Sequence, residues 1–311
     1  MQDPTVHILL ATFQGEAFLS QQLDSIRNQT YTHWVLHISD DGSTDRTREI
    51  IAGFVSTLHQ PVEIYVGPQK GVTHNFFHLL SAVPAANSSD LYAFCDQDDV
   101  WLPGKLQHAV LQYSTLVLAP DQPYLYASRA VIVDQALAPN GFTAFPQKSL
   151  GFGNALLQNV ANGNTMVFNA AQLKIMRHIS PENAVLHDWA AYLVVTACGG
   201  VLYFGKEPLL LYRQHTSNLV GSNLGLGSQL QRMKFMLNGG YKNWADRTIK
   251  ALCQIYPHLT EQSKKELHAF KLNRSLPNPL SRLKMLWNGT VWRQTRRGQL
   301  SLALALILNL I

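Results

Sequence analysis

Apolar and polar residues alternate along the first 130 residues in blocks that predict a βαβα succession. Residues 6–11 form an almost continuous apolar run, which is typical of a strand buried on both faces. Between such runs, apolar residues recur at helical spacing. We expect strands at 6–11, 34–38, 62–66 and 91–95, and helices within 15–29, 44–58 and 75–83. Repeated βα units of this size predict an α/β fold with a mainly parallel, doubly wound sheet.

The pattern changes along the rest of the chain. Shorter strands are expected at 124–127, 131–133, 165–168 and 201–204, with a helix over 186–197. Beyond about residue 225 the strand signal vanishes, and the remainder is helical with breaks at Pro257, Pro277 and Pro279. We therefore predict an α/β domain over 1–225 and a helical, basic C-terminal region over 226–311 that ends in an apolar tail.

Polar and acidic residues follow three of the first four predicted strands, at 12–16, 39–45 and 96–101. Ligands of open α/β sheets bind beyond the carboxyl ends of the strands, so we expect these segments to line one crevice. Five or more carboxylates in one crevice repel each other unless a cation neutralises them. Such hard oxygen ligands suit Mg²⁺ or Mn²⁺, which can hold a diphosphate. For Asp45, capping of the next helix remains an alternative.

Several motifs of other enzyme classes are absent. No GxGxxG follows the first strand, and there is neither a GxxxxGK[ST] phosphate loop nor a GxSxG nucleophile turn. The three cysteines, Cys95, Cys198 and Cys253, are scattered, so they predict no disulfide framework and favour a reducing compartment. The first residues also lack the basic and apolar segments of a signal peptide.

The net charge of +5 is unevenly distributed. Residues 229–311 hold 14 basic and 3 acidic residues, a net +11, whereas residues 1–228 have a net charge of −6. This asymmetry favours an anionic partner, and no nucleic-acid motif is present. The apolar stretch 300–311 is shorter than the roughly 20 residues of a membrane span but long enough to enter a bilayer surface. We expect peripheral attachment to the cytoplasmic face of an anionic membrane; a last helix packed on the core is the alternative.

The segments Thr-Phe-Gln-Gly-Glu, Asp-Asp-Gly-Ser-Thr-Asp and Asp-Gln-Asp-Asp-Val-Trp, at these spacings, resemble family 2 inverting glycosyltransferases with the GT-A fold. The resemblance covers about residues 4–220. It implies that Asp96 and Asp98 form a DxD motif, which binds a divalent metal and the donor diphosphate. It also implies that the nucleoside is held by Thr12, Phe13, Glu16, Asp40 and Asp41, with Asn75 near the nucleotide.

The same resemblance implies a catalytic base. The family has an acidic pair at the start of a helix under the acceptor, and the matching segment here is His187-Asp188-Trp189, with His in place of the first acid. Asp188 is therefore the expected base, and a helix N-terminal acid is its alternative reading. Residues 212–218 resemble a signature of bacterial rhamnosyltransferase-like members, which makes His215 a candidate third metal ligand or, alternatively, a solvated loop histidine.

These features predict a non-processive enzyme. Processive members have QxxRW, and Gln229, Arg232 and Met233 only approach that motif. We expect transfer of one sugar, L-rhamnose from a dTDP donor, to a lipid-linked or polysaccharide acceptor in bacterial surface polysaccharide synthesis. A UDP-sugar donor and an inactive membrane-recruited scaffold remain alternatives. A sugar-nucleotide pyrophosphorylase would need a basic Gly-rich loop after the first strand, which residues 14–16 do not provide.

Overall fold

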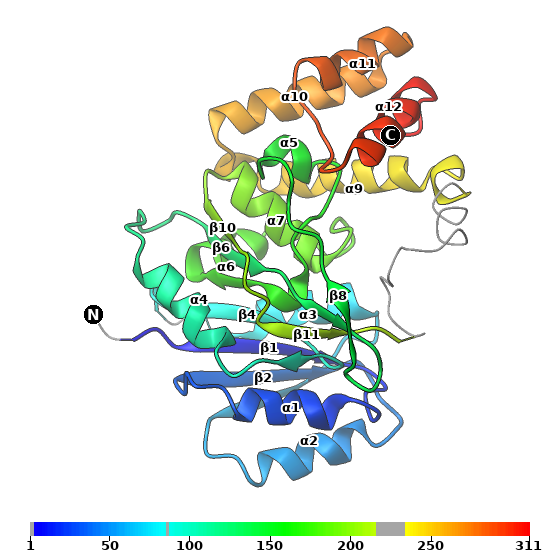
Figure 1. The fold of residues 1–311 in the computed structure, drawn as a ribbon. Helices are drawn as coiled ribbons and strands as arrows, with labels where there is room; N and C mark the ends of the chain where they lie inside the picture. The colour runs from blue at the N-terminus through cyan, green and yellow to red at the C-terminus, as the bar shows by residue number, and fades with distance from the viewer. Residues whose placement is uncertain (1–2, 85–86, 216–233) are drawn as a thin grey trace.

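A seven-stranded sheet forms the centre of the computed structural model, which describes residues 3–84, 87–215 and 234–311 (Figure 1). Its order is β10-β6-β9-β4-β1-β2-β3. The strands are β1 (Val6–Thr12), β2 (Trp34–Asp40), β3 (Val62–Val66), β4 (Leu91–Asp96), β6 (Tyr124–Ser128), β9 (Val167–Asn169) and β10 (Val201–Gly205). Neighbouring strands run parallel except β9, which is antiparallel to both β4 and β6. The predicted mainly parallel α/β sheet is confirmed.

Helices cover both faces of this sheet, which explains the continuous apolar run of β1. Ile8 and Leu10 pack with α1, α2 and α4, whereas Leu9 and Ala11 pack with α3, α6 and α7. Burial on both faces removes the polar alternation of a half-exposed strand. These helices and the short α5 are α1 (Leu19–Arg27), α2 (Thr47–Val55), α3 (Val72–Ala82), α4 (Lys105–Ser114), α5 (Phe152–Ala155), α6 (Ala170–Met176) and α7 (His187–Ala197).

A second, four-stranded sheet of order β5-β11-β7-β8 lies beside the carboxyl ends of the central strands. Its strands are β5 (Val100–Trp101), β7 (Val131–Val133), β8 (Pro139–Phe142) and β11 (Leu210–Arg213). Only β7 is predicted from the sequence. The others are two to four residues long and include the fully exposed β8, so they give no apolar periodicity. This sheet brings β11 next to the acidic segment that follows β4.

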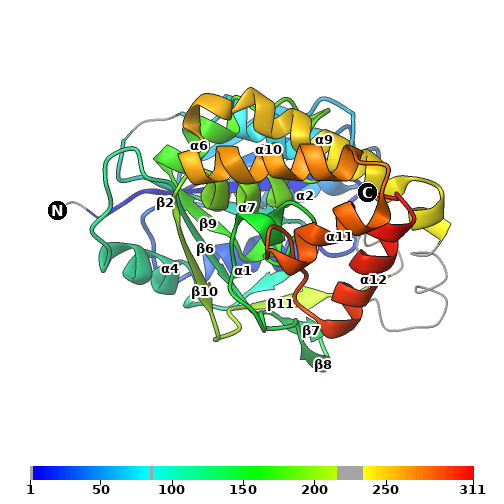
Figure 2. The ribbon, with the colours of Figure 1, turned by 90° about the horizontal axis from the view of Figure 1, so that it is seen from above.

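The chain beyond residue 233 is helical, as predicted. Its elements are α9 (Gly240–Gln254), the 3₁₀ turn η2 (Tyr256–His258), α10 (Glu261–Ser275), α11 (Pro279–Trp287) and α12 (Arg296–Ile307). In both views α9 and α10 lie over α6 and α7, and α11 and α12 lie to one side of them (Figures 1 and 2). Pro257, Pro277 and Pro279 fall at the expected breaks. The predicted domain boundary near residue 225 and the partial match to QxxRW at Gln229, Arg232 and Met233 lie outside the described residues.

The C-terminal helices share the core of the α/β part. Leu252 of α9, Phe270 of α10 and Leu306 of α12 are buried in the same apolar cluster as the side chains of α7. The tail is folded back rather than free: Leu302 and Leu306 are buried, whereas Leu300 is 72% exposed. No helix in the described ranges is both long and apolar enough to cross a bilayer.

Candidate active site

Strand register brings the three predicted segments together. Thr12 pairs with Asp40 across β1 and β2, and Ala11 pairs with Asp96 across β1 and β4. Because these strands are parallel neighbours, their carboxyl ends form one edge of the sheet. The segments at 12–16, 39–45 and 96–101 therefore lie side by side, at the place where open α/β sheets bind ligands.

The loop after β1 is fastened to the loop after β4 by one side chain, Gln97. Its Oε1 accepts the backbone N–H of Phe13 and its Nε2 donates to the Phe13 carbonyl, both at 2.8 Å. A Cβ at Gly15 would lie 2.5 Å from Gln97 Oε1, so a larger residue there would displace the Gln97 side chain. The Phe13 ring is 55% exposed at this edge, an open aromatic face on which a nucleobase could stack.

Asp40 is a buried carboxylate held by hydrogen bonds. It accepts from Thr12 Oγ1 at 3.1 Å, Ser43 Oγ at 2.5 Å and Arg48 Nε at 2.8 Å. Burial alone would raise the pKa of Asp40, but the hydrogen bonds from Ser43, Arg48 and Thr12 hold it below its ordinary value. Asp40 is thus ionised at neutral pH and fixes Thr12 at the edge.

Asp41 and Asn75 shape the neighbouring loop. Asp41 accepts the backbone N–H groups of Gln69 and Gly71 at 2.6 and 2.7 Å, immediately before α3. Asn75 is 1% exposed, and both polar atoms of its side chain bond to Ser39, at 2.5 and 2.8 Å. Both residues border the predicted nucleotide site, but their side chains already have partners in the protein. Their direct contact with a nucleotide remains a prediction.

Two more acids of this edge fix the start of α2. Glu16 accepts the backbone N–H of Arg46 at 3.1 Å. Asp45 accepts the N–H groups of Glu16 and Thr47 at 3.0 Å each, so it holds the first residue of α2 from one position before the N-cap, which is Arg46. Glu16 is exposed and stays a predicted nucleoside contact.

The acidic segment that begins at the last residue of β4 contains two partly buried aspartates, Asp96 and Asp98. Asp98 Oδ2 lies 2.7 Å from Nε2 of His215, which follows β11 by two residues. Burial, together with the nearby carboxylates of Asp98 and Asp188, raises the pKa of Asp96 above its usual range. A cation beside Asp96 would offset both the cost of burying its charge and the repulsion from the neighbouring carboxylates. His215 is therefore paired with Asp98 and is not a solvated loop histidine.

The third acid, Asp99, has a structural position that the sequence does not indicate. It is fully buried and accepts from Asn164 Nδ2 at 2.6 Å and from the backbone N–H of Arg213 at 3.2 Å. The Lys105 ammonium, also buried, lies 3.8 Å from the centre of the Trp101 ring and interacts electrostatically with Asp99 and Asp96. Burial lowers the pKa of Lys105 to about 8. Lys105 and Asn164 are missed by sequence reasoning because only the fold brings them here.

The donor set of this segment fits a divalent metal. Within the described ranges, no three His, Cys, Asp or Glu side chains converge as a complete metal site. Asp98 and His215 nevertheless present an oxygen and a nitrogen donor together, and Asp96 adds a carboxylate within electrostatic reach. Carboxylate oxygens with an imidazole suit Mn²⁺ and, less specifically, Mg²⁺, with diphosphate oxygens and water as remaining ligands.

Asp188 lies in the first turn of α7, close enough to the acidic segment for its charge to raise the pKa of Asp96. Its Oδ2 accepts the backbone N–H of Gly163 at 3.1 Å, and its Oδ1 accepts the N–H of Trp189 at 2.7 Å. Burial raises the pKa of Asp188 to about 6. A carboxylate with this pKa is ionised at neutral pH and still basic enough to take a proton.

His187, which stands where the family has an acid, is a core aromatic residue here. It is 6% exposed and stacks on Phe76 with ring centroids 3.8 Å apart, with the edge of Phe94 at 4.7 Å. Neither ring nitrogen has a hydrogen-bond partner, and burial lowers the pKa of His187 to about 3. It therefore stays neutral and supports the position of Asp188 by packing.

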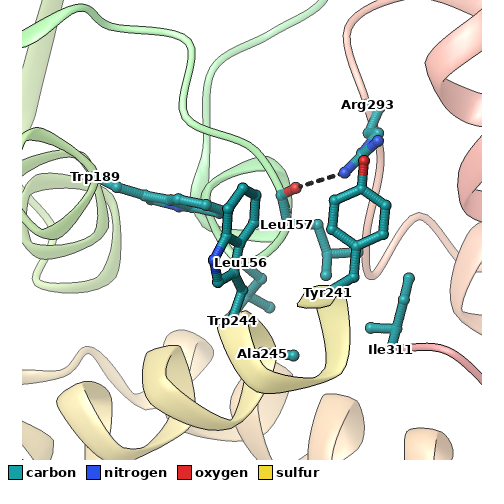
Figure 3. A pocket seen from close by; sticks show the side chains of 8 residues that line it. All are labelled: Leu156, Leu157, Trp189, Tyr241, Trp244, Ala245, Arg293 and Ile311. Carbon is teal, nitrogen blue, oxygen red and sulfur yellow. Dashed lines mark hydrogen bonds between the residues drawn. The ribbon is translucent and has the colours of Figure 1, made fainter. Parts of the chain in front are cut away.

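An aromatic pocket joins the helix of Asp188 to the C-terminal helices (Figure 3). The Trp189 and Trp244 rings meet edge to face at 5.5 Å, and the Arg293 guanidinium lies 5.1 Å from the Tyr241 ring centre. The lining residues are Leu156, Leu157, Trp189, Tyr241, Trp244, Ala245, Arg293 and Ile311. The C-terminal region thus contacts α7 directly beside Asp188.

Comparisons with known proteins agree with this geometry. Residues 7–116 match the model of glycosyl transferase family 2. The chain is 28% identical over 253 residues to the "dTDP-rhamnosyl transferase RfbG" of Shigella flexneri, covering 78% of this chain and 84% of that protein. It is 27% identical over 164 residues to the Escherichia coli "UDP-Glc:alpha-D-GlcNAc-diphosphoundecaprenol beta-1,3-glucosyltransferase WfgD", covering 52% of this chain and 59% of that protein.

Solved structures share the fold at low identity. TarS residues 1–349 of Staphylococcus aureus, in complex with UDP, align at 15% identity with a TM-score of 0.51, covering 92% of this chain and 78% of that one. The mannosyltransferase PcManGT of Pyrobaculum calidifontis, in complex with GDP-Man and Mn²⁺, aligns at 15% identity with a TM-score of 0.52, covering all of this chain and 82% of that one. These alignments confirm the GT-A architecture.

Proposed function

We propose that this chain is a member of glycosyl transferase family 2 and moves a single sugar from a nucleotide donor to an acceptor hydroxyl, with inversion. Our proposed donor is dTDP-L-rhamnose, supported by the name of the Shigella flexneri relative. UDP-glucose is the alternative, supported by the name of the Escherichia coli relative. We propose a lipid-linked or polysaccharide acceptor in the synthesis of bacterial surface polysaccharide.

In this mechanism Asp188 is the general base. Its carboxylate takes the proton of the acceptor hydroxyl while that oxygen attacks the anomeric carbon from the face opposite the leaving group. The bond between the anomeric carbon and the diphosphate oxygen breaks, and the nucleoside diphosphate leaves with the electron pair. One displacement inverts the configuration. Asp188 is regenerated when it releases the proton to solvent.

Asp96, Asp98 and His215 are proposed to hold a divalent metal on the donor diphosphate. When bound, the metal stabilises the negative charge that develops on the leaving group. The residues themselves set where the diphosphate lies, since Asp98 and His215 are already paired at 2.7 Å. Thr12, Phe13, Glu16, Asp40 and Asp41, with Asn75 beneath them, are proposed to surround the nucleoside on the adjoining edge.

The observation that carries this proposal is the turn η1 (Gly163–Thr165), which links the base to the acidic segment. The Gly163 N–H bonds Asp188, and the next side chain, Asn164, bonds Asp99. The base and the diphosphate site are therefore held at a fixed spacing. Such preorganisation supports direct displacement, because the acceptor oxygen and the anomeric carbon must meet between the two groups.

We also propose that the C-terminal helices hold the enzyme at the cytoplasmic face of an anionic membrane. Leu300, Leu304 and Leu308 are 72%, 47% and 50% exposed and recur every four residues along one side of α12 and its end. Arg296 and Arg297 are exposed in the first turn of the same helix. An apolar stripe with adjacent basic residues suits an anionic bilayer surface.

A thermal-shift panel of dTDP, UDP, GDP and CMP, each with and without Mn²⁺, tests the donor. A ligand at a hundredfold excess over its dissociation constant stabilises the folded state by about 2.7 kcal/mol. We expect dTDP to raise the melting temperature most, and only in the presence of Mn²⁺. An equal shift with UDP would favour the alternative donor, and no shift with any nucleotide would contradict the proposed function.

A further inference from the structure

Arg213 at the end of β11 is a buried cation with no role in the reaction described above. Its side chain is 1% exposed, yet it has hydrogen-bond partners on three separate segments. Nε donates to the backbone carbonyl of Asp98 at 2.8 Å, and the two terminal nitrogens donate to the Gln135 carbonyl and the Gln21 side chain. The Arg213 backbone N–H bonds Asp99 as well. Arg213 thus anchors the acidic segment through the Asp98 backbone and the Asp99 side chain.

Arg213 is also linked to His215, the partner of Asp98, through the ring of Phe18. The guanidinium carbon lies 4.5 Å from the centre of the Phe18 ring, and the Phe18 ring centre lies 5.0 Å from that of His215. Phe18 therefore touches both the guanidinium and the imidazole. We call Arg213, Phe18, Asp98 and His215 the Arg213 clamp. Within this clamp, Arg213 holds Asp98 by a hydrogen bond to the Asp98 backbone carbonyl, and the Phe18 ring packs against the His215 ring.

The chemistry of arginine explains why a buried cation would be kept here. Removing a guanidinium from water costs free energy, and an apolar residue in a buried position is often as stable. Only a planar fork with five N–H donors, however, can bond acceptors on three segments at once, and lysine cannot reproduce that geometry. We therefore infer that arginine at residue 213 fixes the position of the acidic segment and does not only stabilise the fold.

We propose that Arg213 is a positioning residue, which sets the spacing of Asp98 and His215 before metal and donor bind. The inference rests on the proposed function, in which these two side chains hold the metal. A displacement of about 1 Å at a reacting site can cost on the order of 100-fold in rate, so a fixed spacing has a large effect. The prediction is a loss of metal affinity when Arg213 is replaced.

The test measures Mn²⁺ binding without donor, by electron paramagnetic resonance of free Mn²⁺. Arg213→Lys and Arg213→Met should bind Mn²⁺ at least tenfold more weakly than the unchanged protein. Arg282→Lys is the matched control: Arg282 is 4% exposed and donates to the carbonyls of Leu276, Pro277, Leu306 and Ile307, all far along the chain from the metal site. It should lose melting temperature but keep its Mn²⁺ affinity.

A readout without metal separates positioning from general stability. Amide hydrogen exchange across residues 97–100 should become faster in Arg213→Met, while exchange in the centre of β4 stays slow. Phe18→Leu keeps the hydrogen bonds of Arg213 but removes the ring that contacts His215, and it should weaken Mn²⁺ binding several-fold. This variant tests the clamp even when Arg213→Met fails to fold.

The outcomes separate the inference from the proposed function. Normal Mn²⁺ affinity in Arg213→Lys and Phe18→Leu, together with lost affinity in Asp98→Ala, would overturn the positioning role and leave the metal site intact. If the unchanged protein binds no Mn²⁺, the proposed metal site is wrong and the inference fails with it. Weaker binding in both clamp variants, with Arg282→Lys unaffected, supports it.

Discussion

Asp188 combines two properties that a general base needs, namely a fixed position and a raised pKa. Replacing it by Asn keeps the shape but removes the proton acceptor. We expect transfer to fall by roughly 10²–10⁴-fold, the usual contribution of general base catalysis. Nucleotide binding should survive, as measured by thermal shift. Transfer within a few-fold of the unchanged enzyme would mean that another acid at this edge is the base.

The same residue predicts the pH dependence of transfer. Burial raises the pKa of Asp188 to about 6, and only the ionised carboxylate can accept the hydroxyl proton. The rate should therefore rise with pH through about 6 and level off above it. Steady-state rates between pH 4.5 and 8 measure this profile. A rate that is flat across this range would contradict the assignment.

Buried histidines predict a different response, in stability. Burial lowers the pKa of His187 to about 3 and that of His37 to about 4, from 6.5. Below pH 6.5 the unfolded chain therefore takes up protons that the folded chain does not, and the folded state loses stability as the pH falls. In His187→Leu the drop in unfolding free energy from pH 7 to pH 5 should be smaller than in the unchanged protein, by denaturant titration.

Comparing His187→Leu with the unchanged protein separates the contribution of His187 to the pH dependence of stability from that of the buried carboxyl groups. Burial raises the pKa of Asp96 and Asp188, so these residues change stability with pH in the opposite direction. An equal drop in both proteins would show that His187 is not buried in neutral form.

The sequence identifies the acids of the site because of where they stand, directly after predicted strands. Strand order and direction alone are enough to place Asp40 and Asp96 at one edge. Lys105, Asn164 and Arg213 cannot be placed in this way, because their partners lie 4 to more than 100 residues away and are brought near only by folding. The residues next to Lys105, Asn164 and Arg213 in the sequence show no pattern that would predict that these polar side chains are buried.

At the scale of elements, the turn η1 sets the position of the base. A Cβ on Gly163 would lie 2.8 Å from His187 Nε2 and 3.0 Å from the Asp188 Cβ, so Gly163→Ala must shift the start of α7. Transfer should fall at least tenfold, since the base moves, while nucleotide binding persists. Gly53→Ala is the control, because no atom lies within 4 Å of its Cβ and it sits inside α2.

That control should gain stability, by about 0.5–1 kcal/mol, since alanine is the better helix former. Full transfer activity in Gly163→Ala would show that the base tolerates displacement, contrary to the role given to η1.

Among the strands, prediction from the sequence succeeds where burial is symmetrical. The strands β1, β2 and β4 are covered on both faces and form apolar runs. The strand β3 is predicted as well, but it lies at the sheet edge, where Ile64 is 56% and Val66 77% exposed. The second sheet is missed apart from β7, because strands of two to four residues are stabilised by their neighbours rather than by their own pattern.

For the whole molecule, the C-terminal tail has two sides with different roles. Leu302 and Leu306 hold α12 in the core, so removal of the entire tail would destabilise the protein. The substitution Leu300→Ala, Leu304→Ala, Leu308→Ala removes only exposed apolar surface. It should leave the melting temperature within a few degrees but reduce sedimentation with anionic vesicles at least tenfold.

The matched control is Leu111→Ala on α4, where the side chain is 52% exposed on a different part of the surface. It should not change vesicle binding. Raising the salt concentration should weaken binding of the unchanged protein, because charges are screened beyond about 10 Å at 0.1 M. Vesicle binding that survives the triple substitution would contradict membrane contact through α12.

The most direct measurement of the central claim is release of nucleoside diphosphate from dTDP-rhamnose, UDP-glucose and GDP-mannose, with Mn²⁺, in the unchanged protein and in Asp98→Ala. We expect that one donor is turned over, that chelation of the metal stops the reaction, and that Asp98→Ala releases no more nucleoside diphosphate than the background. Turnover that persists in Asp98→Ala or without metal would contradict the assigned diphosphate site. No release from any of these donors, by transfer or by hydrolysis, would favour the alternative of an inactive scaffold.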